Sequence, residues 1–577
     1  MAAVTGEPAD RLRLCVAVTA HRDLLKDEVP AIEARVEACF RELMSGFPEL
    51  PLTLLTPLAS GGDQLAARVA HRMGLPFLAV LPMELGEYEK DFDDATTLAD
   101  FRALLNKAEE VLCLPRISAE TTEPFGERHR QVQYAQLGVF LSNHCQVLLA
   151  LWDGKAGSRL GGTAQVVQYH LTAVMPGFHA DTSPGSLLAD NENDLVHHIV
   201  CSRDRPDGDA AAGLQALDAA WFSSRDDGAR SAALPADYRT LLSRLEQFSV
   251  DWRDKEATIE SASASLLQNA PDLSLPSGCP LTDRLFRAAD GLAVHYQKRV
   301  HNSLRAIYLL AVLMGLEFIA YSEFDGPGYM ILLFLALFLA GVVVHLIGER
   351  REWHRKYLDY RALAEGLRVQ LYWNLAGVVN SFSAQFAYDS FLQQQDVDLG
   401  WIRHVMRRAS LHRIRGEEPD ERWVPWVIDQ WVGDPVAGQG QWAYYSSKEL
   451  ENTRRYRRTS RLGNLSLWAG IGFALLLLLM GGDGHAGTRQ LLLIPMGALP
   501  LIAGIWDAYS HKRAEKELIK QYAFMGRVFA KANSLLNANA DLEFQRSVLK
   551  AVGEAALDEG AEWLLMHRER PLEHGTL

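Results

Sequence analysis

Four long apolar runs, grouped in two close pairs, limit what this chain of 577 residues can fold into. The first pair, IYLLAVLMGLEFIAY and YMILLFLALFLAGVVVHLI, occupies about residues 305–322 and 329–347, and the second pair occupies about residues 464–480 and 490–506. Each run approaches the roughly 20 apolar residues that a helix needs to cross a hydrocarbon core of about 30 Å. A buried helix of a soluble core is an alternative for the last run, which contains two prolines. Two tight pairs of such runs favour membrane hairpins, so the lipid bilayer is an expected partner.

Basic residues gather at the ends of the apolar runs that lie away from the two short turns. They are Lys298, Arg299 and Arg305 before the first run, Arg350, Arg351, Arg355 and Lys356 after the second, Arg454, Arg455, Arg457, Arg458 and Arg461 before the third, and Lys512 and Arg513 after the fourth. The turns hold Arg489 beside Glu323, Asp325 and Asp483. Because cytoplasmic flanks accumulate Lys and Arg, both turns are expected to face outward and both chain termini to be cytosolic. This topology predicts a multi-pass protein of the inner, cytoplasmic membrane.

The two hairpins resemble two copies of one unit. Tyr329 and Gln490, which head the second and fourth runs, lie 161 positions apart, and the patterns before the first and third runs align at nearly the same offset. A polar, charged helix is predicted after each hairpin. We expect a first two-helix module over residues 301–395, an aromatic and basic cytosolic connector over 396–462, and a second module over 463–577 with a cytosolic carboxyl-terminal helix. Both copies have the same orientation, unlike the inverted repeats of many transporters.

Short β-rich runs alternate with amphipathic helical stretches from Leu12 to about Arg203, as in an α/β, Rossmann-like domain with a largely parallel sheet. The expected strands are LRLCVAVT, LTLLTPL, PFLAVLP, EVLCLP, CQVLLALW and LVHHIVCS. The expected helices are Glu28–Met44, Asp63–Met73, Leu98–Lys107, Gln131–Asn143 and Thr163–Val174. We assign residues 1–203 to this domain. Residues 204–300 follow as an acidic linker or lobe and a helical coupling region, whose helix from Leu281 to Arg305 is expected to continue into the first apolar run.

Charge and cysteine usage exclude several classes of function. The chain carries 58 basic and 72 acidic residues, a formal charge of −14, whereas nucleic-acid binding needs a basic face. Its 6 cysteines form no C-x-x-C pair, so neither a disulfide framework nor a thiolate zinc site is expected. The adjacent His197 and His198 have no evident third ligand for a metal. The first residues contain no apolar run that would indicate a cleaved signal.

Polar residues and glycines follow three of the expected strands, at the edge where ligands bind in parallel sheets. The candidate ligand-binding residues are Thr19, His21 and Arg22 after the first strand, Ser60, Gly61, Gly62 and Asp63 after the second, and Asp153, Gly154, Gly161, Gly162 and Thr163 after the fifth. Glycines before a helix let backbone N–H groups approach a phosphate, and the helix dipole favours its negative charge. Alternatively, Asp63 and Thr163 are plain helix N-caps, His21 is a structural histidine and Arg22 is a surface charge.

These strand ends resemble the SLOG superfamily of nucleotide-binding domains. The resemblance rests on AVTAHRD, PLASGGDQLAARVAHRMGLPFLAVLP, LPMELGEYEKDF and LLALWDGKAGSRLGGTAQVV, and it covers about the first 200 residues. The carboxyl half resembles the two-helix SLATT effector modules. The resemblance implies a nucleotide or NAD-derived ligand, ADP-ribose-like or a cyclic nucleotide, with no required cofactor, and a role in bacterial antiphage defence.

One departure from the superfamily bears on catalysis. Its hydrolytic LOG enzymes use a P-G-G-x-G-T-x-x-E motif whose glutamate helps attack the N-glycosidic bond. In this chain Val166 or Gln165 falls at that position, depending on the alignment, and neither can ionise. The resemblance therefore implies a pocket that holds a nucleotide without cleaving it. No catalytic residue is assigned, although Asp153 or Asp63 is available as an acid.

Together these features predict a membrane effector or ligand-gated ion channel, in which a cytosolic domain senses a nucleotide and controls an oligomeric membrane region. Four spans are few for a pore, so a homo-oligomer is expected. Glu317 lies within an apolar run and is a pore candidate, because carboxylates at membrane depth are functional by default; a position at the membrane interface is the alternative. If Glu317 lines a pore, Glu323 and Asp325 of the adjoining turn are pore candidates too, and the three carboxylates would favour cations. The alternatives are a membrane-tethered nucleotide or phosphoribosyl hydrolase and a membrane scaffold or transporter. The Trp- and Arg-rich residues 385–441 suit both the membrane interface and protein contacts, and the plain interpretation is interfacial packing between the hairpin copies.

Overall fold

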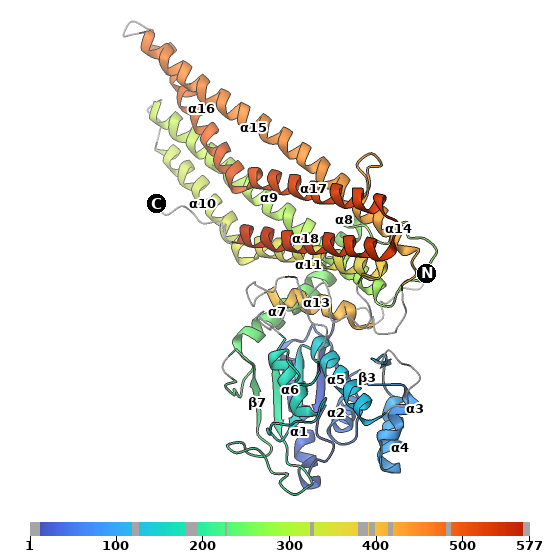
Figure 1. The fold of residues 1–577 in the computed structure, drawn as a ribbon. Helices are drawn as coiled ribbons and strands as arrows, with labels where there is room; N and C mark the ends of the chain where they lie inside the picture. The colour runs from blue at the N-terminus through green and yellow to red at the C-terminus, as the bar shows by residue number, and fades with distance from the viewer. Residues whose placement is uncertain are drawn as a thin grey trace, which may run out of the picture. The chain divides into compact units, whose positions relative to one another are not determined.

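The chain forms two compact units in a computed structural model, shown in Figure 1. The structure describes residues 12–117, 126–178, 193–225, 228–323, 328–378, 391, 399–412, 419–480 and 486–568. The first unit, here called the sheet unit, contains Met1–Ala257, Ala264–Ala288 and Leu363–Trp423. The second, the helical unit, contains Thr258–Ser263, Ala289–Ala362 and Val424–Leu577. The chain therefore enters and leaves the sheet unit more than once.

The sheet unit is built on seven strands, counted within the described residues, in the order β4-β3-β2-β1-β5-β6-β7. Their bounds are β1 Leu14–Ala20, β2 Leu52–Thr56, β3 Phe77–Leu81, β4 Glu110–Cys113, β5 Val147–Trp152, β6 Val196–Val200 and β7 Ala219–Phe222. The first six pair in parallel, and β7 runs antiparallel to β6. The expected α/β domain with a largely parallel sheet is confirmed, and so are its six expected strands.

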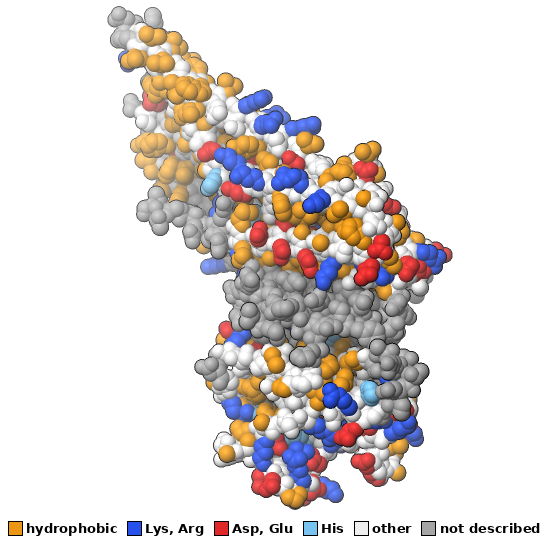
Figure 2. All heavy atoms as spheres, in the orientation of Figure 1, with side chains coloured by type: hydrophobic (Ala, Val, Ile, Leu, Met, Phe, Trp, Pro, Cys, Tyr) orange, Lys and Arg blue, Asp and Glu red, His pale blue; other side chains and the backbone are white. Residues whose placement is uncertain are grey.

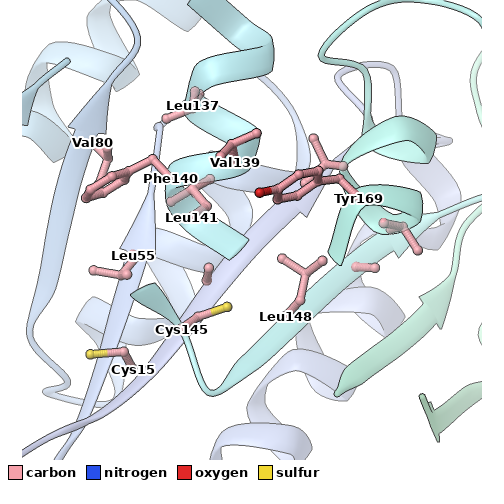
Figure 3. Close-up of a cluster of buried hydrophobic side chains, with 14 of the residues drawn as sticks. Cys15, Leu55, Val80, Leu137, Val139, Phe140, Leu141, Cys145, Leu148 and Tyr169 are labelled. Carbon is pink, nitrogen blue, oxygen red and sulfur yellow. The ribbon is translucent and has the colours of Figure 1, made fainter. Parts of the chain in front are cut away.

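Helices cover both faces of this sheet, which is why the strands are almost continuously apolar. The helices are α1 Val29–Gly46, α2 Gly62–Arg72, α3 Leu85–Tyr88, α4 Ala95–Leu105, α5 Glu127–His144 and α6 Thr163–Thr172. Apart from the short α3, they lie within a few residues of the expected ranges. Figure 3 shows one face, where α5 and α6 pack on the strands: Phe140, Leu141 and Tyr169 join Cys15, Leu55, Val80 and Leu148 in one buried cluster.

The last strand, β7, lies within residues 204–237, which the sequence suggested as an acidic linker or lobe. It pairs with β6 from Val196↔Phe222 to Ile199↔Ala219, and Trp221 is fully buried. The sheet therefore extends beyond residue 203, where the sequence suggested a domain boundary. A strand of only four residues, AAWF, is too short to show a period among the surrounding alanines, glycines and aspartates.

Part of the Trp- and Arg-rich segment also belongs to the sheet unit. Helix α13, Gly400–Ser410, buries all of its residues. The ring centroids of Trp401 and Phe248 lie 5.7 Å apart, and Phe248 belongs to α7, Ala236–Asp254. Ser410 Oγ lies 3.3 Å from His144 Nε2 of α5. Of the two interpretations, this helix makes protein contacts, and they are contacts within the sheet unit rather than between the hairpin copies.

In the part of the chain that the structure describes, four helices are long and apolar enough to cross a membrane. They are α9 Cys279–Glu323, α10 Tyr329–Arg350, α15 Gly440–Leu479 and α16 Ala486–Lys512, whose apolar stretch begins at Leu491. The other helices are α8 Glu256–Ala262, α11 Trp353–Ala376, α14 Trp423–Val427, a π-helical turn Ile428–Val432, α17 Glu515–Ala538 and α18 Leu542–Arg568. The expected continuation of the coupling helix into the first apolar run is confirmed, because α9 contains both.

The apolar side chains of these four helices are largely unburied. Helix α10 buries none of its residues, and Leu332 and Leu339 are 67% and 61% exposed. Figure 2 shows hydrophobic side chains gathered toward the ends of these helices. Apolar surface of this extent marks a region that contacts lipid or other protein chains. The chain is therefore membrane-associated by its helices, and the pairing of the hairpins as repeats stays a prediction.

Candidate functional site

The strand order creates a switch point in the sheet. From β1 the chain proceeds outward through β2, β3 and β4, and it then returns to place β5 on the other side of β1. Ligands of open parallel sheets bind in the crevice that such a reversal leaves beyond the carboxyl ends of the strands. A cavity of about 620 Å³ lies there, lined by the ends of β1 and β5 and by the loop that leads into α6.

Eight of the twelve predicted ligand-binding residues line this cavity. They are Thr19, His21, Arg22, Asp63, Asp153, Gly161, Gly162 and Thr163. The other four, Ser60, Gly61, Gly62 and Gly154, are not part of its wall. Sequence reasoning thus located the cavity from three strand ends that are far apart in the chain.

The glycines before α6 shape the wall beside that helix. Gly161 has a φ of +70°, and a Cβ on it would lie 2.6 Å from the backbone nitrogen of Ala135 in α5. The Thr163 hydroxyl donates to the carbonyl oxygen of Ala20 at 2.9 Å, which fixes the start of α6 to the end of β1. Thr163 does not act as the side-chain N-cap, since the N-cap position is Gly162. The positive end of the α6 dipole, which favours an anion, therefore lies at the cavity.

The glycine pair before α2 serves a different purpose. A Cβ on Gly61 would lie 2.2 Å from the carbonyl oxygen of Arg22, and a Cβ on Gly62 would lie 2.4 Å from the Ala20 Cβ. The Gly62 N–H donates to the carbonyl oxygen of His21 at 3.1 Å. These glycines let α2 approach the end of β1, and the N–H of Gly62 is already used within the protein. The geometry therefore favours a phosphate at α6 rather than at α2.

His21 and Asp153 form a buried pair across the switch point. His21 Nε2 lies 3.2 Å from Asp153 Oδ1, and the same oxygen accepts the Lys155 N–H at 3.0 Å. Burial lowers the pKa of His21, while the adjacent Asp153 carboxylate opposes that shift. The Arg203 and Arg205 guanidinium groups lie 3.9 and 4.0 Å from Asp153 Oδ2. His21 is thus held by a partner, as in the structural alternative, and also faces the cavity.

Asp63 is the second buried carboxyl group at the cavity. Its side chain does not cap α2, and within the described residues its Oδ1 atom has no hydrogen-bond partner. Burial raises the pKa of Asp63 well above its usual value, although the positive charge of Arg22 acts in the opposite direction. The protonated form that burial favours can donate a hydrogen bond, for example to a ligand oxygen.

A hydrogen-bond network that includes residues of α5 forms another part of the cavity wall. Arg22 donates to the Tyr134 hydroxyl at 2.9 Å, and that hydroxyl donates to Asp91. Arg130 donates to Asp91 Oδ1 at 2.6 Å. Sequence reasoning assigned none of Arg130, Tyr134 and Asp91 to the site, although Asp91 lies within the stretch LPMELGEYEKDF that carries part of the resemblance. For Arg130 and Tyr134, the available signal was their four-residue spacing, which places both on one face of α5.

Positive charge predominates at the cavity by a small margin. Six basic residues line it: Arg22, Arg130, Lys155, Arg159, Arg203 and Arg205. Five acidic residues line it as well: Asp23, Asp63, Asp91, Glu127 and Asp153. Arg203 pairs with Asp23 through two hydrogen bonds of 2.8 and 3.0 Å. Arg159 is exposed, which leaves its guanidinium group accessible to an anionic ligand.

Neither candidate for the glutamate position of the LOG motif supplies an acid. Gln165 is buried and is not part of the cavity wall. Val166 lines the cavity and also belongs to the core cluster. A Cβ on Gly138 of α5 would lie 2.5 Å from the Val166 Cγ2, so these helices pack closely at this position. The position is therefore apolar or inaccessible in either alignment.

The pore candidates Glu317 and Glu323 lie elsewhere, toward the carboxyl end of α9. Glu317 lies within the helix, and its Oε1 atom is buried with no hydrogen-bond partner in the described part of the chain. Glu323 is the last residue of α9, and Asp325 lies outside the described residues. In the same region, a Cβ on Gly315 would lie 2.3 Å from Leu501 of α16, so α9 and α16 are in close contact.

The adjacent histidines of β6 have structural partners. His198 Nε2 lies 2.9 Å from the carbonyl oxygen of Trp152, and its Nδ1 lies 2.8 Å from Arg230. The ring centroids of His197 and Trp221 lie 4.3 Å apart. Over the described ranges, no three His, Cys, Asp or Glu side chains are grouped so that they could hold a metal ion.

Comparison with known proteins adds no identification. No protein-family model matches the chain, and no curated protein matches it.

Proposed function

We propose that the sheet unit binds a nucleotide or an NAD-derived ligand and thereby controls the membrane helices of the same chain. The resemblance to SLOG domains and SLATT modules supports this assignment, with a role in bacterial antiphage defence. In this proposal the chain is a multi-pass protein of the cytoplasmic membrane, both termini are cytosolic, and a homo-oligomer forms the output region. The output is an ion-conducting pore or a comparable breach of the bilayer.

One observation carries the proposal: a cavity of about 620 Å³ lies at the switch point beside the start of α6. Its volume falls within the roughly 300–1,000 Å³ of typical small-molecule sites. The Gly161 turn and the helix dipole favour an anion there, and the exposed Arg159 suits a phosphate. The buried carboxyl group of Asp63 suits a hydroxyl-bearing or carbonyl-bearing part of the same ligand.

The sensing step can be tested by thermal shift on the detergent-solubilised full-length chain. The ligands are NAD, ADP-ribose, cyclic ADP-ribose isomers and cyclic oligonucleotides. A ligand at about 100 times its Kd stabilises the folded state by about 2.7 kcal/mol. We expect a stabilising ligand whose effect is lost in Arg159→Glu and retained in Arg35→Glu. Arg35 is a matched control because it is equally exposed but lies on α1, away from the cavity wall.

The output step needs a separate experiment. The stabilising ligand should raise ion flux across proteoliposomes that contain the full-length chain, with the Arg159→Glu variant as the control. If the ligand binds but does not change the ion flux, the sensing role of the sheet unit stands and the channel role of the membrane helices is refuted. If Glu317 lines the pore, Glu317→Gln should weaken the cation preference, whereas an unchanged preference would exclude it from the pore.

A specific observation favours a second candidate, a membrane-tethered nucleotide or phosphoribosyl hydrolase. His21, Asp153 and Asp63 line one cavity, and burial favours neutral His21 and protonated Asp63. A neutral imidazole and a protonated carboxyl group are the forms that a general base and a general acid require. Turnover of NAD or a nucleoside monophosphate by the full-length chain, abolished in His21→Gln with binding retained, would establish this candidate. Binding without turnover would exclude it.

A further inference from the structure

Helix α15 changes abruptly from basic to apolar along its length. Within Gly440–Leu479, five arginines lie from position 454 to position 461, and the apolar run follows from about residue 464. The arginines are Arg454, Arg455, Arg457, Arg458 and Arg461, and all five are exposed. Figure 2 shows basic side chains along the middle of this helix. At 100° per residue, the five positions span about 160° of the helix circumference, so they form one face.

The same face continues into the apolar part of the helix. On the same helical projection, Leu465 and Trp468 lie within the arc that the arginines occupy. Leu465 is 66% exposed and Trp468 is 68% exposed. Arg461 and Leu465 are separated by about 6 Å along the helix axis. The exposed face of α15 therefore presents cations followed immediately by apolar side chains, in the order in which a lipid presents its headgroup and acyl chains.

Basic residues of other segments of the helical unit lie near one edge of this face. Tyr308 of α9 lies beside Tyr509 of α16, with ring centroids 5.3 Å apart. Lys516 Nζ of α17 lies 5.7 Å from the ring centroid of Tyr456, on the side of α15 opposite the arginines, so α17 leaves the arginine face open. Arg305, Arg455 and Arg513 are close enough for their charges to act on His301.

Nearby carboxylates neutralise only part of this basic cluster. Within the described residues, none of the five α15 arginines has a carboxylate oxygen within 4.0 Å. Glu451, one turn before Arg455, pairs with Lys448 at 2.8 Å. Arg513 lies 3.7 Å from Glu515. Like charges that converge in this way repel one another, and a bound anion relieves that repulsion.

We propose that these α15 arginines, together with the exposed Arg305, form an arginine collar that binds the phosphodiester headgroups of anionic lipids. Guanidinium groups bind phosphate oxygens in a bidentate manner, and basic clusters directly beside a membrane helix attract anionic lipids. Trp468 suits the boundary between headgroup and acyl chain. The collar is independent of the nucleotide cavity, which lies in the other unit, so either assignment can fail without the other.

The test uses the full-length chain in detergent and a fluorescent phosphatidylglycerol, whose binding is followed by anisotropy. We expect phosphatidylglycerol to bind more tightly than labelled phosphatidylcholine. Arg454→Gln with Arg458→Gln should weaken phosphatidylglycerol binding by about thirtyfold, because each basic residue at an anionic surface contributes about fivefold. Lysine at both positions should keep most of the affinity. Arg35→Gln with Arg239→Gln is the matched control, since both arginines are exposed in the sheet unit.

Three results would overturn the collar. Equal affinities for phosphatidylglycerol and phosphatidylcholine would show that the site does not recognise the anionic headgroup. An equal loss in the control pair would show a general effect of charge. Displacement of the lipid by inorganic phosphate would assign the site to a free anion. A salt titration of the unaltered chain keeps the proposal testable if the double variant misfolds, because a salt-independent affinity contradicts electrostatic binding.

Discussion

Gly161→Ala tests whether the wall of the cavity depends on the turn before α6. The glycine has a φ of +70°, where an L residue costs about 1–2 kcal/mol. The added Cβ would also lie 2.6 Å from the Ala135 nitrogen and from the Tyr134 carbonyl carbon. These are backbone atoms of a helix, so they cannot rotate away, and overpacking of this kind costs about 1–3 kcal/mol. Gly161→Ala should therefore lower the free energy of unfolding by about 2–5 kcal/mol in total, and the ligand should no longer stabilise the variant.

Gly74→Ala is the matched control for this substitution. Gly74 has a nearly identical φ of +73°, but nothing lies within 4 Å of an added Cβ. At Gly74 the substitution should cost only the roughly 1–2 kcal/mol that an L residue loses at a positive φ. Hydrogen exchange of the β1 and β5 amides in the full-length chain reports the opening free energy of the sheet, with a tenfold change in rate for about 1.4 kcal/mol. Equal effects of the two substitutions would refute the close contact between Gly161 and α5.

Two further predictions concern helix packing and pH. Gly470→Ala should lower the thermal midpoint of the solubilised chain, because the added Cβ would lie 2.6 Å from the Pro500 ring. Gly472→Ala is the control and should not lower it, because nothing lies within 4 Å of its added Cβ. Equal midpoints of the two variants would contradict the contact between α15 and α16. Acidification should destabilise the sheet unit through His170, whose pKa burial lowers to about 4. The unfolded chain takes up the proton near pH 6.5, so this stability is complete above that pH and is lost as the pH falls toward about 4. For this histidine the loss of the free energy of unfolding approaches about 3 kcal/mol. If His170→Gln and the unaltered chain show the same pH profile of β6 amide exchange, His170 does not contribute.

The fold was predictable where a pattern repeats over enough residues. Strands buried on both faces, such as LCVAVTA of β1, are continuously apolar, and their flanking glycines and polar residues mark the ends. The four-residue β7 is too short to show such a pattern. Helix α13 had a usable signal: Trp401, Ile402, Val405, Met406 and Ala409 recur at helical spacing. Three arginines and a histidine lie among them, and these polar residues also suited the membrane interface.

The site was predictable from strand ends but not from helix faces. His21 and Asp153 follow directly after β1 and β5, so parallel pairing of these strands brings them together. Arg130 and Tyr134 reach the cavity only because α5 crosses this face of the sheet, and no local pattern specifies that crossing. The glycine pairs looked equivalent in sequence. Their difference lies in what each approaches: Gly61 meets the end of β1, and Gly161 meets α5.

The division of the chain into units also distinguishes the two hairpins, which the sequence presented as equivalent copies. The first hairpin is flanked on both sides by segments of the sheet unit, Ala264–Ala288 before it and Leu363–Trp423 after it. The second hairpin lies within Val424–Leu577, entirely in the helical unit. Since α9 and α11 each contribute residues to both units, any rearrangement of the sheet unit on ligand binding has two covalent helical connections to the first hairpin. It reaches the second hairpin through one covalent connection, at Trp423–Val424 in the short α14, and the π-helical turn interrupts the helical path before α15 begins. A nucleotide-driven output should therefore change the environment of α9 and α10 before that of α15 and α16, and site-specific fluorophores on each pair would resolve the order.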